Sequence, residues 1–292
     1  MERVTSLQFW MDGLLKSNLN SIVYNMRKDY DSLINISGSG MVRVGKSVLG
    51  QQVGLFIAER LGTPFGLKNI VFSGNSLMKA AKSLPRNSVI IYDEARGELD
   101  VKKVMENVTK ALLDFFAECG MYNHCLIMIL PDFFELPKSL AINRSEILLN
   151  VLRIPEDAID EQGNEVVAFE RGVFEFYNRR GKKMLYILGK KNYDDYGIGK
   201  KYRSFTGDFP DVFVVDRKDY ENKKLEHIQR ERGSKYTDIR FAIAIKTLCE
   251  HISQRAAAIE LKKNGVQLSQ ARLSQLISQV SRIEGQSAID KR

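Results

Sequence analysis

Residues 40–47 combine two glycines, a lysine and a serine at a spacing that suits phosphate binding. They read G-M-V-R-V-G-K-S and fit the pattern G-x-x-x-x-G-K-[ST]. Glycine lets backbone amides approach phosphate oxygens closely, and a helix that begins where the loop ends adds the positive end of its dipole. We therefore expect ATP to bind here, the alternative being a chance match in a glycine-rich turn. The predicted binding residues are Gly40, Arg43, Val44, Gly45, Lys46, Ser47 and Val48, with Lys46 at the outer phosphates and Ser47 at Mg²⁺.

Two acidic residues, Asp93 and Glu94, follow the apolar run 88–92 further along the chain. An acidic residue at the tip of a central strand can reach a magnesium ion beside the phosphate loop. We predict that Asp93 holds Mg²⁺ through a water ligand, and that Glu94 polarises the attacking water as a general base. An acid pair that only caps its strand is the alternative.

Two further side chains are candidates for contacts with the γ-phosphate. Asp132 follows the apolar run 125–130 and is the candidate sensor, with a helix N-cap or turn role as the alternative. Arg144 is the first candidate for stabilising charge on the transferred phosphoryl group, in its own subunit or from a neighbouring one, because it comes at the start of a strand near the expected site. Arg96 is the second, and a structural surface arginine is the alternative for each.

The elements that position these residues alternate between apolar runs and helical patterns. The expected strands are 33–36, 69–72, 88–92, 125–130 and 147–152, and the expected helices are 5–28, 46–61, 76–83 and 101–119. This alternation predicts an α/β fold, a P-loop NTPase with a central, mostly parallel sheet covered on both faces. Residues near 165–190 are predicted to form an antiparallel β-hairpin that turns at residues 178–181.

The C-terminal part has the proportions of a helix-turn-helix. Helices are expected at 253–261 and 269–277, with Ala257 and Ile259 packing on Leu273, Leu276 and Ile277. An ordinary helical hairpin used for subunit contact is the alternative. The candidate DNA-binding residues are Ser269, Gln270, Arg272 and Gln275 here, with Arg179 and Arg180 at the expected hairpin tip, where a solvated turn is the alternative.

Charge is distributed unevenly along the 292 residues. Residues 1–177 hold 19 Lys and Arg against 22 Asp and Glu, a net charge of −3, whereas residues 178–292 hold 25 against 14, a net charge of +11. This asymmetry favours a nucleic-acid partner for the second half, although a solvated basic surface is the alternative. The expected organisation is an N-terminal helix (1–29), an ATPase domain (30–215) and a helical C-terminal domain (216–292).

Membrane and secretion signals are not expected from the sequence. No run of about 18 apolar residues occurs, so we expect no membrane span, and the first residues lack the apolar core of a signal peptide. The 3 cysteines show no metal-ligand spacing and suit a reducing cytoplasm.

The motifs resemble those of P-loop ATPases of the FtsK/HerA type, especially compact forms carried by mobile elements and viruses. The matching parts are residues 36–47, 90–95, 125–130 and the pair Asn143-Arg144, within roughly residues 30–155. The resemblance implies a DNA-pumping ATPase that works as a homo-oligomeric ring, commonly a hexamer, and some members end in a DNA-recognising winged helix. The family commonly has Gln or Asn where Asp132 stands here.

The first hypothesis is therefore an ATP-hydrolysing motor that acts on double-stranded DNA in translocation, packaging or conjugative transfer. A second is an ATP-dependent DNA-binding regulatory or partition protein that switches shape without translocating. A third, a small-molecule kinase, is weakest, because a basic helical tail supplies neither an acceptor site nor a lid.

Overall fold

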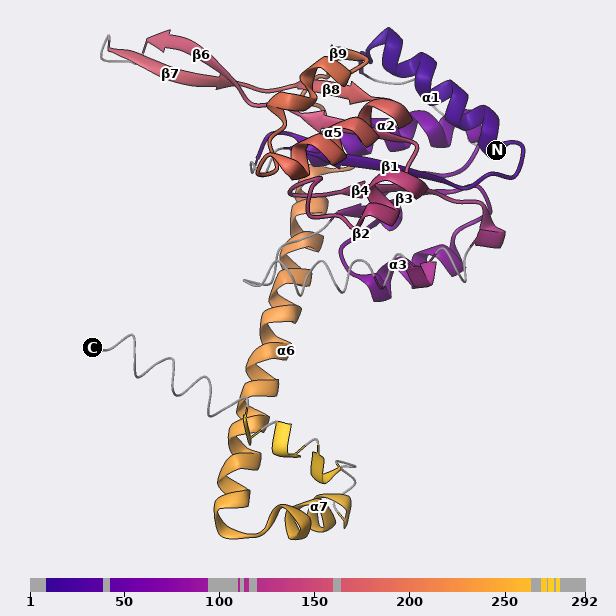
Figure 1. Cartoon of the computed structure of the whole chain (residues 1–292). Coiled ribbons are helices and arrows are strands. Elements are labelled where there is room, and N and C mark those ends of the chain that lie inside the picture. Colours follow the sequence, from indigo (N-terminus) through magenta and orange to yellow (C-terminus); the bar gives the residue numbers. More distant parts are fainter. Residues whose placement is uncertain are drawn as a thin grey trace. The chain divides into compact units, whose positions relative to one another are not determined.

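A seven-stranded sheet forms the centre of the first part of the chain (Figure 1). The computed structural model describes residues 9–38, 43–93, 110, 113–115, 120–159, 164–263, 269–271, 273–275 and 277–278. These residues belong to two units, 1–224 and 225–292, so the expected boundary at 215/216 precedes the observed one. Within the described residues, no helix is both long enough and apolar enough to cross a membrane.

The sheet is mostly parallel, which confirms the expected α/β class. Its strands are β1 (Ser32–Ser37), β2 (Ile70–Val71), β3 (Val89–Asp93), β4 (Cys125–Ile129), β5 (Ile147–Val151), β8 (Val173–Tyr177) and β9 (Phe205–Asp208). Their order is β2-β3-β4-β1-β5-β8-β9; the first five strands are parallel, and the pairings of β8 with β5 and with β9 are antiparallel. All residues of β1, β3, β4 and β5 are buried, as expected for parallel strands covered on both faces.

The pairing register sets which strand ends meet. Ile36 of β1 and Asp93 of β3 both pair with Ile129 of β4. The carboxyl ends of these three strands therefore lie at one edge of the sheet. Each of the three expected site segments, the phosphate loop, Asp93 and Asp132, follows one of these strands or ends it.

Three of the four helices listed here for the first unit begin at side-chain caps. They are α1 (Gly13–Met26), α2 (Lys46–Leu61), α3 (Gly74–Ser83) and α5 (Arg179–Lys191), with short 3₁₀ turns at Leu67–Asn69, Gly120–Tyr122 and Gly197–Tyr202 and a π-helical segment, η3, at Ser139–Arg144. The side chains of Asp12, Ser73 and Asn178 accept hydrogen bonds from backbone amides at the starts of α1, α3 and α5. The expected helix 101–119 lies almost entirely outside the described residues.

The predicted hairpin that turns at residues 178–181 is wrong. Residues 179–191 form helix α5, because Asn178 caps the amide of Gly181 and the buried residues Lys182, Leu185 and Gly189 recur at helical spacing. The actual hairpin comes earlier and pairs β6 (Ile154–Ile159) with β7 (Glu165–Glu170). These two strands form a separate sheet that extends away from the main one (Figure 1).

The second unit is helical in its described part. Helix α6 (Arg217–His251) begins in the first unit and ends in the second, and α7 (Gln254–Lys263) follows it. Ala257 and Leu273 are buried together with Ile245, and Ile277 packs against them. Ile259 is 54 % exposed, so its predicted packing is wrong, because it lies on the outer face of α7. Leu276 lies outside the described residues.

Candidate functional site

The phosphate loop leads into α2 through a glycine that no other residue can replace without strain. Gly45 has φ +99° and occupies the N-cap of α2, where Lys46 and Ser47 form the first turn. A Cβ at Gly45 would lie 3.1 Å from the ring of Phe209, so both the backbone angle and the space require glycine. The structure has a helix N-terminus here, as predicted, with its amides and dipole directed at the loop.

Lys46 folds back toward the start of the loop. A Cβ at Gly38 would lie 2.9 Å from Cγ2 of Val44 and 3.3 Å from Nζ of Lys46, so the lysine side chain lies beside Gly38, two residues before the loop. Arg43 is exposed and has φ +59°. Val48 is buried in the first turn of α2, whereas Gly40 lies outside the described residues. The two ends of the loop therefore approach each other around the lysine.

Ser47 and Asp93 meet across the sheet edge. The Ser47 hydroxyl donates a 2.7 Å hydrogen bond to Oδ2 of Asp93, which is only 3 % exposed. Strand β4 separates β3 from β1, a gap of roughly 10 Å at two strand spacings, and the first turn of α2 bridges it. A hydroxyl and a carboxylate at a helix N-terminus are the hard oxygen ligands that Mg²⁺ takes together with nucleotide phosphates. These residues therefore fit the expected ion. Glu94 and Arg96 lie outside the described residues.

Two side chains of α6 also reach Asp93, and the sequence gave no reason to expect them. The Tyr220 hydroxyl donates to Oδ2 of Asp93, and Nζ of Lys224 lies 3.2 Å from Oδ1. Burial, and then the negative charge of Asp93, raise the pKa of Tyr220, so the phenol stays protonated and remains a donor. The spacing of four residues puts both side chains on one helix face, but it does not identify the strand that they meet.

A strap formed by residues 209–216 brings α6 to this position. Two buried glutamines of α2 hold it: Oε1 of Gln51 accepts from the amides of Val214 and Val215, and Nε2 of Gln52 donates to the carbonyls of Pro210 and Val212. These contacts fix the strap along the helix that carries Lys46 and Ser47. The start of α6 is thereby aligned with the phosphate loop.

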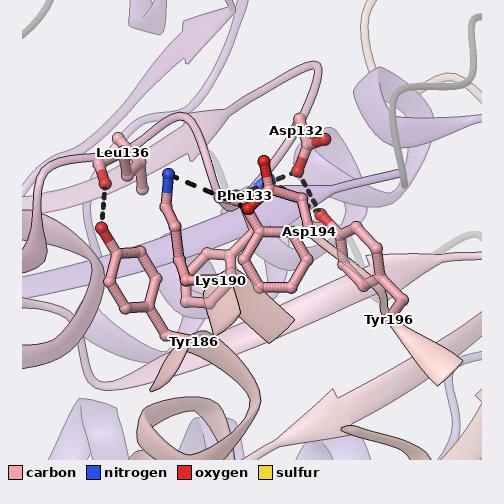
Figure 2. A network of polar contacts seen from close by, with 8 residues as sticks. Asp132, Phe133, Leu136, Tyr186, Lys190, Asp194 and Tyr196 are labelled. Carbon is pink, nitrogen blue, oxygen red and sulfur yellow. Dashed lines mark hydrogen bonds and ion pairs between the residues drawn. The ribbon is translucent and has the colours of Figure 1, made fainter. Parts of the chain in front are cut away.

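Asp132 lies after β4 and takes the turn role that was its alternative reading. Its Oδ1 accepts from the amide of Phe134 at 2.9 Å and from the Tyr196 hydroxyl at 2.8 Å. The Tyr196 oxygen in turn accepts from the Phe133 amide and lies 3.5 Å from Oγ of Ser37. Figure 2 shows the Tyr196 hydroxyl directed at the carboxylate, with Lys190 and Asp194 nearby. Its role as a γ-phosphate sensor stays a prediction.

A second polar network begins at Ser37, immediately before Gly38. The Ser37 hydroxyl donates to Asn150, whose amide lies 3.4 Å from Oε2 of Glu175. Glu175 is 1 % exposed and also accepts from Tyr177 and Arg203, each at 2.8 Å. The buried carboxylate is thus satisfied by several donors, which makes the strand ends beneath the loop rigid. Sequence reasoning missed this network, although Glu175 inside an apolar strand was a visible signal.

Arg144 lies at the opposite edge of the sheet from the phosphate loop. It ends the π-helical segment η3 before β5 begins, and Ile147 of β5 pairs with Ile34, whereas the loop follows Ser37 at the far end of β1. Its expected position near the site of its own subunit is therefore wrong, because parallel strands separate their two ends. A contact with a neighbouring subunit's nucleotide stays a prediction.

The candidate DNA-binding residues fall in two places. Arg179 and Arg180 are exposed at the start of α5 instead of at a hairpin tip, and Arg179 donates to the Asn143 carbonyl at 3.0 Å. Arg180 lines a cavity of about 470 Å³ together with Arg203, Met184 and Tyr202. In the second unit Ser269, Gln270 and Gln275 are exposed, and Arg272 lies outside the described residues.

No protein-family model matches the chain, and comparison with curated protein sequences finds no significant match.

Proposed function

We propose that the chain is a magnesium-dependent, ATP-hydrolysing P-loop protein. The observation that carries this proposal is the 2.7 Å hydrogen bond between Ser47 and Asp93 at the N-terminus of α2, beside Lys46. A phosphate-loop sequence in a chance turn would not be joined to a buried acid from another strand. The alternative of a strand-capping acid is weakened for the same reason.

Each residue has a defined task in this proposal. Lys46 neutralises the outer phosphates, and the amides at the start of α2 bind their oxygens. Ser47 and Asp93 hold Mg²⁺, which supplies charge neutralisation at the phosphates. Glu94, the residue after β3, polarises the attacking water. Tyr196 and Asn150 act indirectly, because both contact Ser37 and hold the strand that precedes the loop.

DNA is the proposed partner of the basic second half of the chain. Residues 178–292 carry a net charge of +11, and the described part of the second unit exposes polar side chains next to a small helical core. A ring-shaped DNA motor is the first candidate. The contact between α6 and Asp93 also favours the second candidate, an ATP-dependent DNA-binding switch, because this helix leads from the nucleotide site into the second unit.

Hydrolysis measured with and without double-stranded DNA tests the proposal. We expect DNA to raise ATP turnover several-fold for a motor, and Lys46→Ala to abolish nucleotide binding. Lys79→Ala, at an exposed position on α3, is the matched control and keeps wild-type turnover. Glu94→Gln should bind ATP without hydrolysing it. A wild-type chain that binds no nucleotide would refute the proposal, whereas turnover that DNA leaves unchanged would favour the switch.

A further inference from the structure

The start of α6 is firmly docked beside Asp93. The Tyr220 ring lies between those of Phe72 and Phe213, with centroid distances of 5.9 and 5.7 Å. Lys223 donates to the carbonyls of Leu67 and Ile70 at 2.9 and 2.6 Å, which fixes the helix to the strand next to β3. These contacts set the rotation of the helix. The Lys224 ammonium is consequently directed at the carboxylate.

Lys224 supplies positive charge to the carboxylate that the proposed function assigns to magnesium. Its Nζ lies 3.2 Å from Oδ1 of Asp93 and 3.2 Å from the Tyr220 hydroxyl. Ser47 and Tyr220 both donate to the other oxygen, Oδ2. An ammonium and a divalent cation repel each other strongly when they share one buried carboxylate. Both cannot occupy this position together without a rearrangement of α6 or of the lysine.

We propose that Tyr220 and Lys224 are positioning residues that hold Asp93 in a resting arrangement, and that magnesium-nucleotide binding displaces Lys224. This inference rests on the proposed nucleotide site. Because α6 continues from Lys224 to His251 in the second unit, the displacement links the nucleotide state to the start of the helix that carries that unit. By linkage, a partner that favours the docked form of α6 weakens magnesium-nucleotide binding by the same factor.

Binding of the non-hydrolysable analogue AMP-PNP, measured calorimetrically with Mg²⁺ and with EDTA, tests this coupling. Lys224→Met should raise the affinity in Mg²⁺ by about fivefold, the effect of removing one partly exposed ion pair, and leave the affinity in EDTA unchanged. Lys224→Arg should behave as wild type. Lys218→Met is the matched control, because this lysine is exposed near the start of the same helix, and it should leave the ratio of the affinities in Mg²⁺ and in EDTA unchanged.

The outcomes distinguish a failure of the Lys224 displacement from a failure of the proposed nucleotide site. The displacement is overturned, and the nucleotide site is left intact, if wild type binds normally and Lys224→Met does not exceed it in the ratio of AMP-PNP affinity with Mg²⁺ to that with EDTA. A wild-type chain that binds no AMP-PNP in either condition overturns the proposed function and the displacement together.

The β6–β7 hairpin supports a second, independent inference. It exposes apolar side chains on a ribbon that belongs to no other sheet: Ile159 is 74 %, Val167 60 % and Phe169 45 % exposed. A two-stranded ribbon alone is marginally stable in water, and apolar residues gathered on one indicate a binding surface. Residues 154–170 also contain six Asp and Glu and no Lys or Arg, and the guanidinium of the preceding Arg153 lies 3.5 Å from the centroid of the Phe169 ring. The ribbon is therefore acidic overall.

The same unit carries a surface of the opposite charge. Residues 178–203 contain nine Lys and Arg against two Asp, and all nine except the buried Lys182 are exposed. Here Arg180 and Arg203 line the cavity of about 470 Å³, with Met184 and Tyr202 as its apolar part. The cavity thus offers positive charge to the acidic hairpin and apolar side chains to its exposed apolar residues.

We infer that the hairpin of one chain binds the α5 cavity of a second copy. The two surfaces differ, so the contact is head-to-tail and builds rings or open chains instead of a symmetric dimer. The inference does not depend on nucleotide chemistry.

Mass measurement in solution tests this contact with a mixing design. Phe169→Lys and Arg180→Glu should each raise the dissociation constant at least about tenfold, as loss of a central contact does, and yield monomers. Each variant retains one intact surface, so an equimolar mixture should form dimers and stop there. Lys79→Glu is the charge-reversal control and should assemble as wild type. A monomeric wild-type chain, or a mixture that stays monomeric, overturns the inference.

Discussion

The Ser47 hydroxyl and the Asp93 carboxylate are joined by a 2.7 Å hydrogen bond although a whole strand, β4, separates the strands that lead to them. The first turn of α2 makes this possible, because it crosses from the end of β1 toward β3. The pair is also where α6 contacts the sheet, through Tyr220 and Lys224. One buried carboxylate therefore connects the loop, the sheet and the helix that enters the second unit.

Substitution of Gly45 should measure how much the stability of the fold depends on glycine at the N-cap of α2. Gly45→Ala places a Cβ at φ +99° and 3.1 Å from Phe209, so we expect a loss of about 2–3 kcal/mol in the free energy of unfolding. Gly62→Ala is the matched control: its φ is +70° but nothing lies within 4 Å of its Cβ, so about 1 kcal/mol is expected. Urea unfolding measures both, and equal losses would show that the Phe209 contact has no effect.

Buried Lys182 should make stability depend on pH in the alkaline range. Burial, and then the charge of Arg179, lower its pKa from 10.5 to about 8, while its ammonium donates to the carbonyls of Ala141 and Ile142. Between these values the unfolded chain binds more protons than the folded one, so stability rises with pH, by up to about 3 kcal/mol from this group.

The variant Lys182→Met isolates that contribution. Unfolding in urea at pH 7.5 and pH 10 should show a larger rise for wild type than for Lys182→Met, because other titrating groups contribute equally to both. An equal rise in the two proteins would mean that Lys182 keeps an ordinary pKa in the folded state.

Two substitutions of Asp132 separate its turn role from its predicted sensor role. Asp132→Asn keeps an oxygen for the Phe134 amide and the Tyr196 hydroxyl, so the stability should change little. Asp132→Ala loses both hydrogen bonds and should destabilise the fold by about 1–3 kcal/mol. A sensor role would in addition lower kcat by about tenfold or more in Asp132→Ala, whereas Asn keeps a polar group that can contact the γ-phosphate. Unchanged kcat in Asp132→Ala would restrict Asp132 to the turn.

Much of the first unit could be predicted from local sequence, because its elements are strongly patterned. The buried strands β1, β3, β4 and β5 are near-continuous apolar runs, and Gly45 precedes a long helix that begins at Lys46, as expected. The run Leu185–Leu188 is ambiguous, because four consecutive apolar residues fit a strand as well as a buried helix face. The signal that favours a helix is Asn178, which is the N-cap of α5.

Contacts between distant segments could not be predicted in this way. Tyr220 and Lys224 lie in a very polar helix, and nothing local connects them with Asp93. Likewise, Arg144 was placed near the site from its closeness to a strand, but only the direction of β5 decides which sheet edge it occupies. Periodicity identifies faces of an element, whereas the partner of a polar side chain depends on the tertiary fold.

The most direct test of the central claim is the magnesium increment in nucleotide binding. We expect wild type to bind AMP-PNP at least about tenfold more tightly with Mg²⁺ than with EDTA, since the ion joins the phosphates to Ser47 and Asp93. Ser47→Ala and Asp93→Asn should each lose this increment while keeping the affinity measured in EDTA. If both variants retain the full increment, Ser47 and Asp93 do not hold the ion, and the account of the site is wrong.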